Sequence, residues 1–324
     1  MIKDKKILVV IITYNRCKTL KLTLDAISHQ SVPVNGILVF DNNSNDSTIS
    51  FLKNSNFLKK SQIKENELII NYEKTGVKYY YRNDSNIGGA GGFSRAIKIA
   101  QKLDYDYLWL MDDDVIPEKQ CLEKLKNAIE NNNVDVAIPN RSDDNFKDRA
   151  VIDFDLESVQ KCFTGQRKKS FYGPFGKKYY FVKDMPFEGP LMKMELSRKV
   201  GLPNPGYFIE YDDSDYAQRI QRFSKIIFVA NTVLHRQLAK PGDQNKKMGP
   251  YNWRTYYTIR NNMVFDRKYG TSWGARNLSP TLLMAHLVVL AYRRGHLKNN
   301  LPIILKAWHD ALFNKMGKRV SPDY

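Results

Sequence analysis

The first 140 residues alternate short apolar runs with segments of helical spacing, and no other feature restricts the possible fold as much. The apolar runs, rich in β-branched and aromatic residues, span residues 7–12, 36–40, 77–81, 107–111 and 135–139. Helical spacing of apolar side chains spans residues 19–29, 47–58, 92–103 and 118–130. Strands that alternate with helices form parallel sheets with crossover helices. The sequence therefore predicts an α/β fold.

The periodicity weakens after Asn140 and returns near residue 188. We expect loops with short strands over 141–186, a helix over 212–222, a strand over 226–230 and a helical tail beyond 251. The chain is therefore expected to have two parts, residues 1–240 and a basic, mainly helical extension over residues 241–324.

The charge of the chain is strongly positive, and much of it lies near the C-terminal end. The 51 Lys and Arg residues against 34 Asp and Glu give a formal net charge of +17. From Tyr251 onward, 12 basic against 3 acidic residues contribute +9. Such a surface attracts nucleic acid or an anionic membrane. Because no base-stacking or groove-reading motif is present, we expect a membrane surface and no nucleic acid.

An apolar stretch over residues 280–292, followed by Arg293 and Arg294, is too short to span a bilayer. It is either a core helix or an interfacial helix with basic anchors, and the sequence leaves both open. The N-terminus lacks the apolar region and cleavage site of a signal peptide. Three widely spaced cysteines indicate neither a disulfide framework nor a zinc site. We expect a cytoplasmic protein, peripheral on the inner face of the cell membrane.

Three consecutive aspartates, Asp112, Asp113 and Asp114, directly follow the apolar run at 107–111. They are predicted to project from the carboxyl end of a buried strand, where open α/β sheets bind ligands. Carboxylates this close repel one another, so a cation is expected to neutralise them. Hard oxygen ligands suit Mg²⁺ or Mn²⁺, and Mg²⁺ in turn binds phosphate oxygens. A solvated acidic turn is the alternative.

Polar residues also end the first two predicted strands, over residues 13–16 and 41–46. Adjacent strand ends of this kind can hold a base and ribose, although Asx and Ser clusters also form ordinary turns and caps. The glycine-dense segment 86–93 opens a helix, whose N-terminus can attract phosphate. It does not match a Walker A loop, and a plain glycine turn is the alternative.

A second acidic cluster contains Glu210, Asp212, Asp213 and Asp215. A carboxylate here could deprotonate an acceptor hydroxyl. A capped helix start would explain one aspartate, but it explains the crowding of four carboxylates less well.

The order of these segments resembles inverting family-2 glycosyltransferases with the GT-A fold. The segments that carry the resemblance are VVIITYNR, VFDNNSND, RNDSNIGGAGGF, LWLMDDDV and YFIEYDDSDYAQRI. The combination of GGAGGF and a triple aspartate is most similar to bacterial galactofuranosyltransferases. The resemblance is specific over residues 7–140, good around 187–236 and vague beyond 250. It implies a Rossmann-like mixed, mainly parallel sheet flanked by helices, with a C-terminal helical extension.

The resemblance also implies roles for individual residues. A divalent metal, Mn²⁺ or Mg²⁺, would be held by Asp112, Asp114 and His235. Asp213 would be the catalytic base, and Asp212 would orient or bind the acceptor. The nucleotide-sugar would be bound by Thr13, Asn15, Arg16, Asp41, Asn42, Arg82, Asn86, Gly89, Asp112 and Asp113.

The implied activity is metal-dependent, inverting transfer of a sugar, galactofuranose from UDP-galactofuranose, to a hydroxyl of a lipid-linked cell-surface glycan. Residues 1–240 would bind the donor and catalyse transfer, and residues 241–324 would contact the acceptor, membrane or a second copy in a homo-oligomer. A rhamnosyltransferase or another hexosyltransferase of the family is the nearest alternative. A sugar-phosphate nucleotidyltransferase is less consistent, because the first strand end at residues 11–15 has no glycine.

Overall fold

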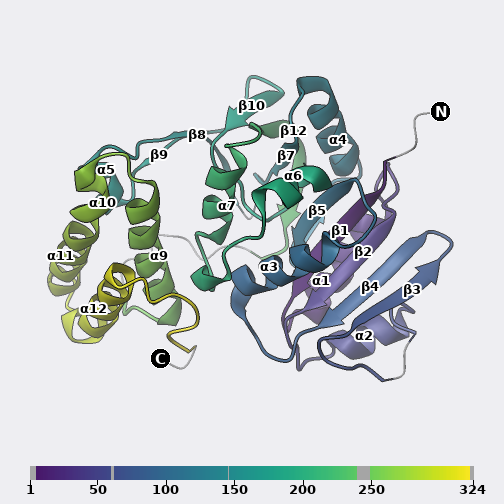
Figure 1. Cartoon of the computed structure of the whole chain (residues 1–324), viewed down its shortest axis with the longest axis horizontal. Helices are drawn as coiled ribbons and strands as arrows, with labels where there is room; N and C mark the ends of the chain where they lie inside the picture. The colour runs from purple at the N-terminus through teal and green to yellow at the C-terminus, as the bar shows by residue number, and fades with distance from the viewer. Residues whose placement is uncertain (1–4, 60–61, 145, 239–248, 322–324) are drawn as a thin grey trace.

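A ten-stranded sheet forms the centre of the molecule in the computed structural model, which describes residues 5–59, 62–144, 146–238 and 249–321 (Figure 1). Its strands are β1 (Ile7–Thr13), β2 (Gly36–Asp41), β3 (Leu68–Glu73), β4 (Gly76–Arg82), β5 (Tyr107–Asp112), β6 (Val115–Pro117), β7 (Val136–Asn140), β10 (Tyr179–Val182), β11 (Leu191–Lys193) and β12 (Ile226–Arg236). The order is β10-β12-β7-β11-β5-β1-β2-β4-β3, and β6 pairs with β12.

The central strands β5, β1, β2 and β4 are parallel neighbours. Their register places Thr13 beside Asp41, and Asp41 beside Arg82. Ile12 pairs with Asp112, so the aspartate triplet begins at the same edge. Strand β11 runs antiparallel between β5 and β7, whereas β7 and β12 are parallel. The predicted mixed, mainly parallel sheet is confirmed, and its carboxyl ends collect the polar residues that follow the strands.

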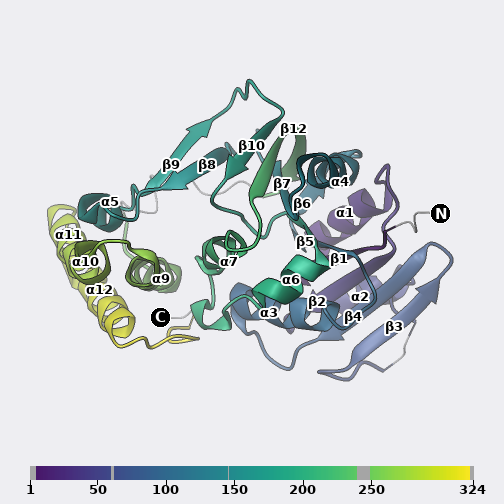
Figure 2. The ribbon, with the colours of Figure 1, turned by 45° about the horizontal axis from the view of Figure 1, so that its top comes forward.

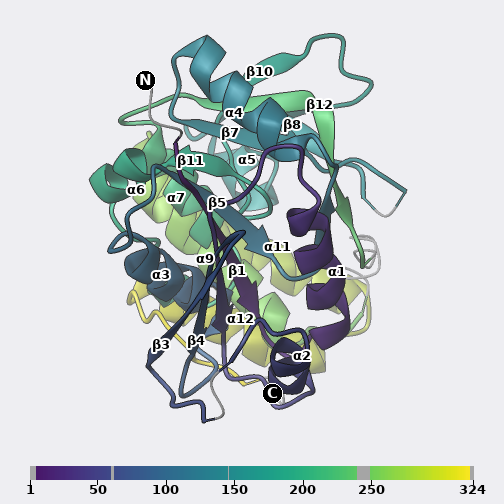
Figure 3. The same cartoon turned by 90° about the vertical axis from the view of Figure 1, so that its right-hand side faces the viewer.

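Helices cover both faces of this sheet (Figures 2 and 3). Because every residue of β1 is buried, its alternate side chains enter two different cores. Leu8, Val10 and Ile12 pack with α3 (Gly88–Ala100), α6 (Met194–Val200) and α7 (Asp212–Ile220). The other face packs with α1 (Cys17–Ser28), α2 (Thr48–Asn54) and α4 (Cys121–Asn132).

The C-terminal helices form a third core beside the sheet, at the left of Figure 1. They are α9 (Trp253–Tyr269), α10 (Trp273–Asn277), α11 (Ser279–Arg293) and α12 (Leu297–Leu312). The hairpin of β8 (Arg149–Phe154) and β9 (Lys168–Tyr172), with α5 (Val159–Thr164) between its strands, lies next to them. No helix of the described residues is both long and apolar enough to cross a membrane.

Several predicted boundaries were wrong. The helix expected over 92–103 begins at Gly88, so the glycine segment forms its first turn. The helix expected over 47–58 ends at Asn54, and Asn56 beyond it has a positive φ of 55°. Strand β3 at the sheet edge was missed, although its alternation of buried and exposed residues is typical of a half-buried strand. The predicted domain boundary at residue 240 lies outside the described residues and stays a prediction.

Candidate active site

Asp113 is the buried anchor of the aspartate triplet. Its carboxylate accepts a hydrogen bond from Thr13 Oγ1 at 2.7 Å and one from the Tyr14 amide at 3.3 Å. Arg16 Nη1 donates to Asp113 Oδ1 at 3.3 Å and to Asp114 Oδ2 at 2.5 Å. Burial raises the pKa of Asp113 to about 6, although Arg16 and Thr13 oppose the shift. The polar end of β1 and the triplet therefore meet, as their sequence positions predict.

Asp112 differs from its two neighbours because no described residue forms a hydrogen bond or ion pair with its carboxylate. Burial raises its pKa well above that of an ordinary aspartate, and the carboxylates of Glu188, Asp114 and Asp113 raise it further. A carboxylate placed among other carboxylates is stabilised by an added cation. The charge of Asp112 is thus uncompensated apart from the influence of Arg16.

These carboxylates suit a hard divalent cation. Asp112 and Asp114 supply oxygen donors, the type that Mg²⁺ and Mn²⁺ prefer, and Asp112 is free to ligate. In the structure, Nδ1 of His235 lies 3.4 Å from Asp143 Oδ2. Among the described residues, no group of three His, Cys, Asp or Glu side chains is arranged to hold an ion. His235 as a third ligand therefore stays a prediction.

Asp41 is fully buried at the end of β2 and organises the neighbouring loops. It accepts hydrogen bonds from the Ser44 amide at 2.6 Å, from Tyr80 Oη at 2.7 Å and from Arg82 Nη1 at 3.2 Å. The Asn15 amide donates to Ser44 Oγ at 3.0 Å, and Asn15 itself is exposed with a φ of 54°. Asn15 and Arg82 thus lie at this sheet edge beside Asp41. Both carboxylate oxygens of Asp41 already accept hydrogen bonds from other residues.

Asn42 fixes the glycine segment to the sheet. Its Nδ2 donates to Asn86 Oδ1 at 3.0 Å and to the Gly88 carbonyl at 3.1 Å. Its Oδ1 accepts from the Ile87 amide at 3.1 Å. A Cβ built at Gly89 meets no atom within 4 Å, so Gly89 borders open space. The start of α3 is therefore rigidly held, yet its backbone stays approachable.

The segment before the second acidic cluster has a strained backbone. Phe208, Glu210 and Tyr211 have positive φ angles of 66°, 65° and 70°, and such conformations cost about 1–3 kcal/mol each in non-glycine residues. The Phe208 carbonyl accepts a hydrogen bond from the Ala90 amide at 3.1 Å. A Cβ at Gly88, whose φ is +76°, would lie 2.2 Å from that carbonyl oxygen. The glycine segment and the acidic segment are consequently in direct contact.

Helix α9 holds this strained segment in place. Asn261, fully buried, donates through Nδ2 to the carbonyls of Tyr207, Ile209 and Glu210 at 3.1, 2.8 and 2.9 Å. Arg254 Nε donates to the Glu210 carboxylate at 2.9 Å. Strain at a functional segment persists only where surrounding contacts enforce it. The sequence predicted a helical tail beyond residue 251 but did not indicate that α9 acts as a clamp.

Asp212 and Asp213 begin α7 directly after the strained segment. Burial and their mutual repulsion raise the pKa of Asp212, and burial together with Asp184 raises that of Asp213. Asp215 differs, because it is fully buried and bonded to Tyr207, Arg219, Lys268 and Tyr269. Two carboxylates with raised pKa values therefore remain for proton transfer, while Asp215 anchors the helix.

Glu188 joins the two acidic clusters and was not singled out from the sequence. It accepts hydrogen bonds from Arg141 Nη1 at 2.9 Å and from Arg236 Nε at 2.9 Å. Its charge raises the pKa of Asp112, whereas Arg141 lowers that of Asp213. The paired Glu188 and Arg141 thus influence the charge of one carboxylate in each acidic cluster. The only sequence signal was a carboxylate beside Gly189 and Pro190, directly before a short strand.

The fold and its acidic edge define a protein of the GT-A class. The sequence profile described as "Glycosyl transferase family 2" matches residues 8–177, more than half of the chain. The chain belongs to glycosyl transferase family 2. No curated protein matches the sequence.

Solved structures support the fold. S. aureus TarS 1-349 in complex with UDP-GlcNAc has a TM-score of 0.54 at 13% identity, covering 94% of this chain and 81% of that one. GalNAc-T7 with UDP, GalNAc and Mn²⁺ also has a TM-score of 0.54 at 13% identity, with coverages of 90% and 55%. A longer S. aureus TarS structure has a TM-score of 0.50 at 13% identity, with 89% of this chain covered; the chain spans 43% of that one. Identities this low establish the shared fold alone.

Proposed function

We propose that the protein is a metal-dependent inverting glycosyltransferase. It would move galactofuranose from UDP-galactofuranose to a hydroxyl of a lipid-linked cell-surface glycan, acting at the inner face of the membrane. The observation that carries the proposal is the placement of Asp112 and Asp213 around the Glu188 network at one sheet edge. Two fold relatives, TarS 1-349 and GalNAc-T7, have solved structures with UDP-GlcNAc and with UDP, GalNAc and Mn²⁺, which supports a nucleotide-sugar donor. The choice of galactofuranose rests on the GGAGGF and triple-aspartate resemblance.

The donor would bind along the carboxyl ends of β1, β2, β4 and β5. Thr13, Asn15 and Arg16, with the loops around Asp41, would surround the uridine. Asn42 and Asn86 hold the glycine segment so that Gly89 can approach the sugar diphosphate closely. Asp113, anchored by Thr13, would keep the triplet in position. Asp112 and Asp114 would hold Mn²⁺ or Mg²⁺, which supplies positive charge for the diphosphate leaving group.

Asp213 would act as the general base. As the acceptor oxygen forms its bond to the anomeric carbon, the hydroxyl proton passes to the Asp213 carboxylate and the bond to the diphosphate oxygen breaks. Attack from the face opposite the diphosphate inverts the anomeric centre. Asp212, whose raised pKa favours a protonated carboxyl, would hydrogen-bond the acceptor. Arg141 and Lys168 lower the pKa of Asp213, so they keep it available as a base.

A donor panel tests the proposal. Thermal unfolding with Mn²⁺ should shift upward with UDP-galactofuranose more than with UDP-galactopyranose or dTDP-rhamnose, because bound ligand stabilises the folded state. UDP release should follow the same ranking. Stabilisation by dTDP-rhamnose alone would assign the protein to rhamnosyl transfer. No response to any nucleotide-sugar would refute a transferase of this kind.

A further inference from the structure

Helix α11 carries an apolar stripe on the side that its neighbours do not cover. Its other side contributes Leu283 and Ala291 to the core that it shares with α9 and α12. The exposed side bears Leu278, which caps the helix start, then Leu282, Val289 and Tyr292, with exposed fractions of 45, 41, 48 and 73%. Steps of three, four or seven residues return to the same side of a helix. The sequence left open whether this segment packs in the core or binds membrane, and the structure shows an apolar surface on both sides.

Helix α12 continues this surface across the seam between the two helices. Trp308 Nε1 donates to Thr281 Oγ1 of α11 at 3.3 Å, so these turns of the helices are adjacent. Leu305, one turn before Trp308, is 42% exposed. Phe313, which caps the C-terminal end of α12, is 66% exposed. We call this surface, from Leu278 to Tyr292 on α11 with Leu305 and Phe313 on α12, the α11–α12 face.

The exposed charges within residues 273–321, which contain α11 and α12, have a single sign. Residues 273–321 contain eight Lys and Arg but one acidic residue, Asp310, which is 1% exposed and bonded to Tyr256 Oη at 2.6 Å. Arg293, Arg294 and Lys298, all exposed, follow the apolar stripe at the end of α11. A partly apolar helix that ends in clustered basic residues is the pattern of interfacial membrane binding.

We propose that the α11–α12 face binds an anionic lipid bilayer. Leu282, Val289 and Tyr292 would enter the boundary between head groups and acyl chains, and the basic cluster would contact lipid phosphates. The helix would lie in the plane of the membrane, since no helix of the described chain can cross one.

A second copy of the chain fits this face less well. Two α11 stripes could pack against each other, but the one carboxylate within residues 273–321, that of Asp310, is buried, so these residues of one copy would offer no exposed carboxylate to the basic residues of the other. Like charges brought together oppose association, whereas an anionic bilayer compensates them.

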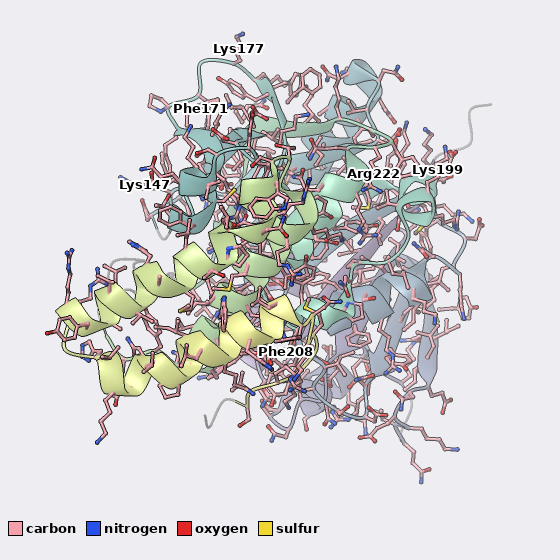
Figure 4. All side chains as sticks on the ribbon, turned by 60° about the vertical axis from the view of Figure 1, so that its left-hand side comes forward. Lys147, Phe171, Lys177, Lys199, Phe208 and Arg222 are labelled. Atoms are coloured by element: carbon pink, nitrogen blue, oxygen red, sulfur yellow. The ribbon has the colours of Figure 1, made fainter. Side chains whose placement is uncertain are left out.

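Helix α9 would connect a membrane bound at this face with the acidic cluster. Helix α9 packs on both α11 and α12 through the third core, and its Asn261 and Arg254 hold the segment before Asp213. Phe208 of that segment lies where the C-terminal helices meet the rest of the molecule (Figure 4). This step rests on the proposed function, because only a lipid-linked acceptor would profit from such a connection.

The test is sedimentation of the full chain with vesicles of phosphatidylcholine, with and without phosphatidylglycerol. Wild-type protein should sediment with the anionic vesicles only. Replacing Arg293, Arg294 and Lys298 by Glu should weaken binding by about a hundredfold, because each basic residue near an anionic surface contributes about a factor of five. Matched reversals of Lys177, Lys199 and Arg222, which lie away from α11 and α12 (Figure 4), should leave binding unchanged.

The apolar part has its own variant. Leu282→Asp with Val289→Asp should weaken vesicle binding at least tenfold, while the equally exposed pair Leu22→Asp with Phe223→Asp should not. Equal sedimentation of the wild type and both α11 variants would overturn the proposal. So would conversion of a dimer to a monomer by the apolar variant, in analytical ultracentrifugation, without a change in lipid binding. UDP release with a soluble acceptor should be unaffected, so absent turnover with intact vesicle binding would refute the transferase proposal alone.

Discussion

Removing the Asn261 amide should separate the positioning of Asp213, the proposed base, from the binding of UDP. In Asn261→Ala, the carbonyls of Tyr207, Ile209 and Glu210 lose a shared donor with two hydrogens. Each buried bond lost costs about 1–3 kcal/mol, so two cost about 2–6 kcal/mol. Relaxation of one positive-φ residue returns about 1–3 kcal/mol. We expect a net loss of about 1–3 kcal/mol in the free energy of unfolding.

The kinetic consequence should be larger than the loss of stability suggests. Once the strained segment relaxes, Asp213 shifts at the start of α7, and a misplacement of about 1 Å can lower a rate about a hundredfold. We expect kcat to fall about a hundredfold at a temperature where the variant is fully folded. The affinity for UDP, which lacks the sugar, should stay within about twofold, because the uridine side at the ends of β1, β2, β4 and β5 is not bonded to residues 207–210; the KM for the full donor should rise through the contact of Ala90 with Phe208.

Three measurements on one preparation decide the outcome: urea unfolding, titration calorimetry with UDP, and steady-state UDP release. Asn299→Ala on the exposed side of α12 is the matched control and should change none of them. A stability loss with an unchanged kcat would show that Asn261 is merely structural. Unchanged stability would refute the clamp, since it would mean that the carbonyls need no donor from α9.

Further expectations concern the base, the metal and the glycine segment. Asp213→Asn should retain UDP affinity but lose turnover, with Asp25→Asn on α1 as the unaffected control; near-normal rates would place the base elsewhere. A general base works only when it is deprotonated, and burial raises the pKa of Asp213 to about 6. We therefore expect kcat to fall about tenfold per pH unit below about pH 6. A kcat that does not change between pH 6 and pH 4 would contradict this expectation. EDTA should abolish transfer, and Asp112→Asn should weaken Mn²⁺ binding in calorimetry; full activity in excess EDTA would exclude a metal. Gly88→Ala should raise the KM for the donor and also lower kcat, because its Cβ would meet the Phe208 carbonyl at 2.2 Å; an effect on the donor alone would contradict the contact.

Short stretches of sequence were enough to predict the central strands and the polar residues at their ends. The buried runs that became β1, β2 and β5 are short, apolar and β-branched, so they read as strands without tertiary information. Polar residues at their ends had to meet, because parallel strands share a carboxyl edge. That rule accounts for the contact of Thr13 and Arg16 with the triplet, although the sequence analysis did not name this contact.

Residues whose partners are remote could not be found in this way. Glu188 pairs with Arg141 and Arg236, each almost fifty residues away, and nothing in the local sequence indicates those contacts. Asn261 reads as an ordinary helix residue until the backbone of Tyr207 to Glu210 is placed beside it. Helix α3 was started too late because glycine disfavours helices in general, whereas here close packing requires it.

The meeting of Gly88 with Phe208 limits how the enzyme could change its specificity. One amide–carbonyl bond, from Ala90 to Phe208, joins the loop that would face the sugar donor to the segment that leads to Asp213, the proposed base. A substitution that reshapes the donor loop therefore also moves the acceptor side. Libraries that vary residues 86–93 alone should yield few active variants, and productive changes should arise in pairs, with compensation near residue 208 or on the inner side of α9. A change in donor specificity would then usually be accompanied by a change in acceptor specificity.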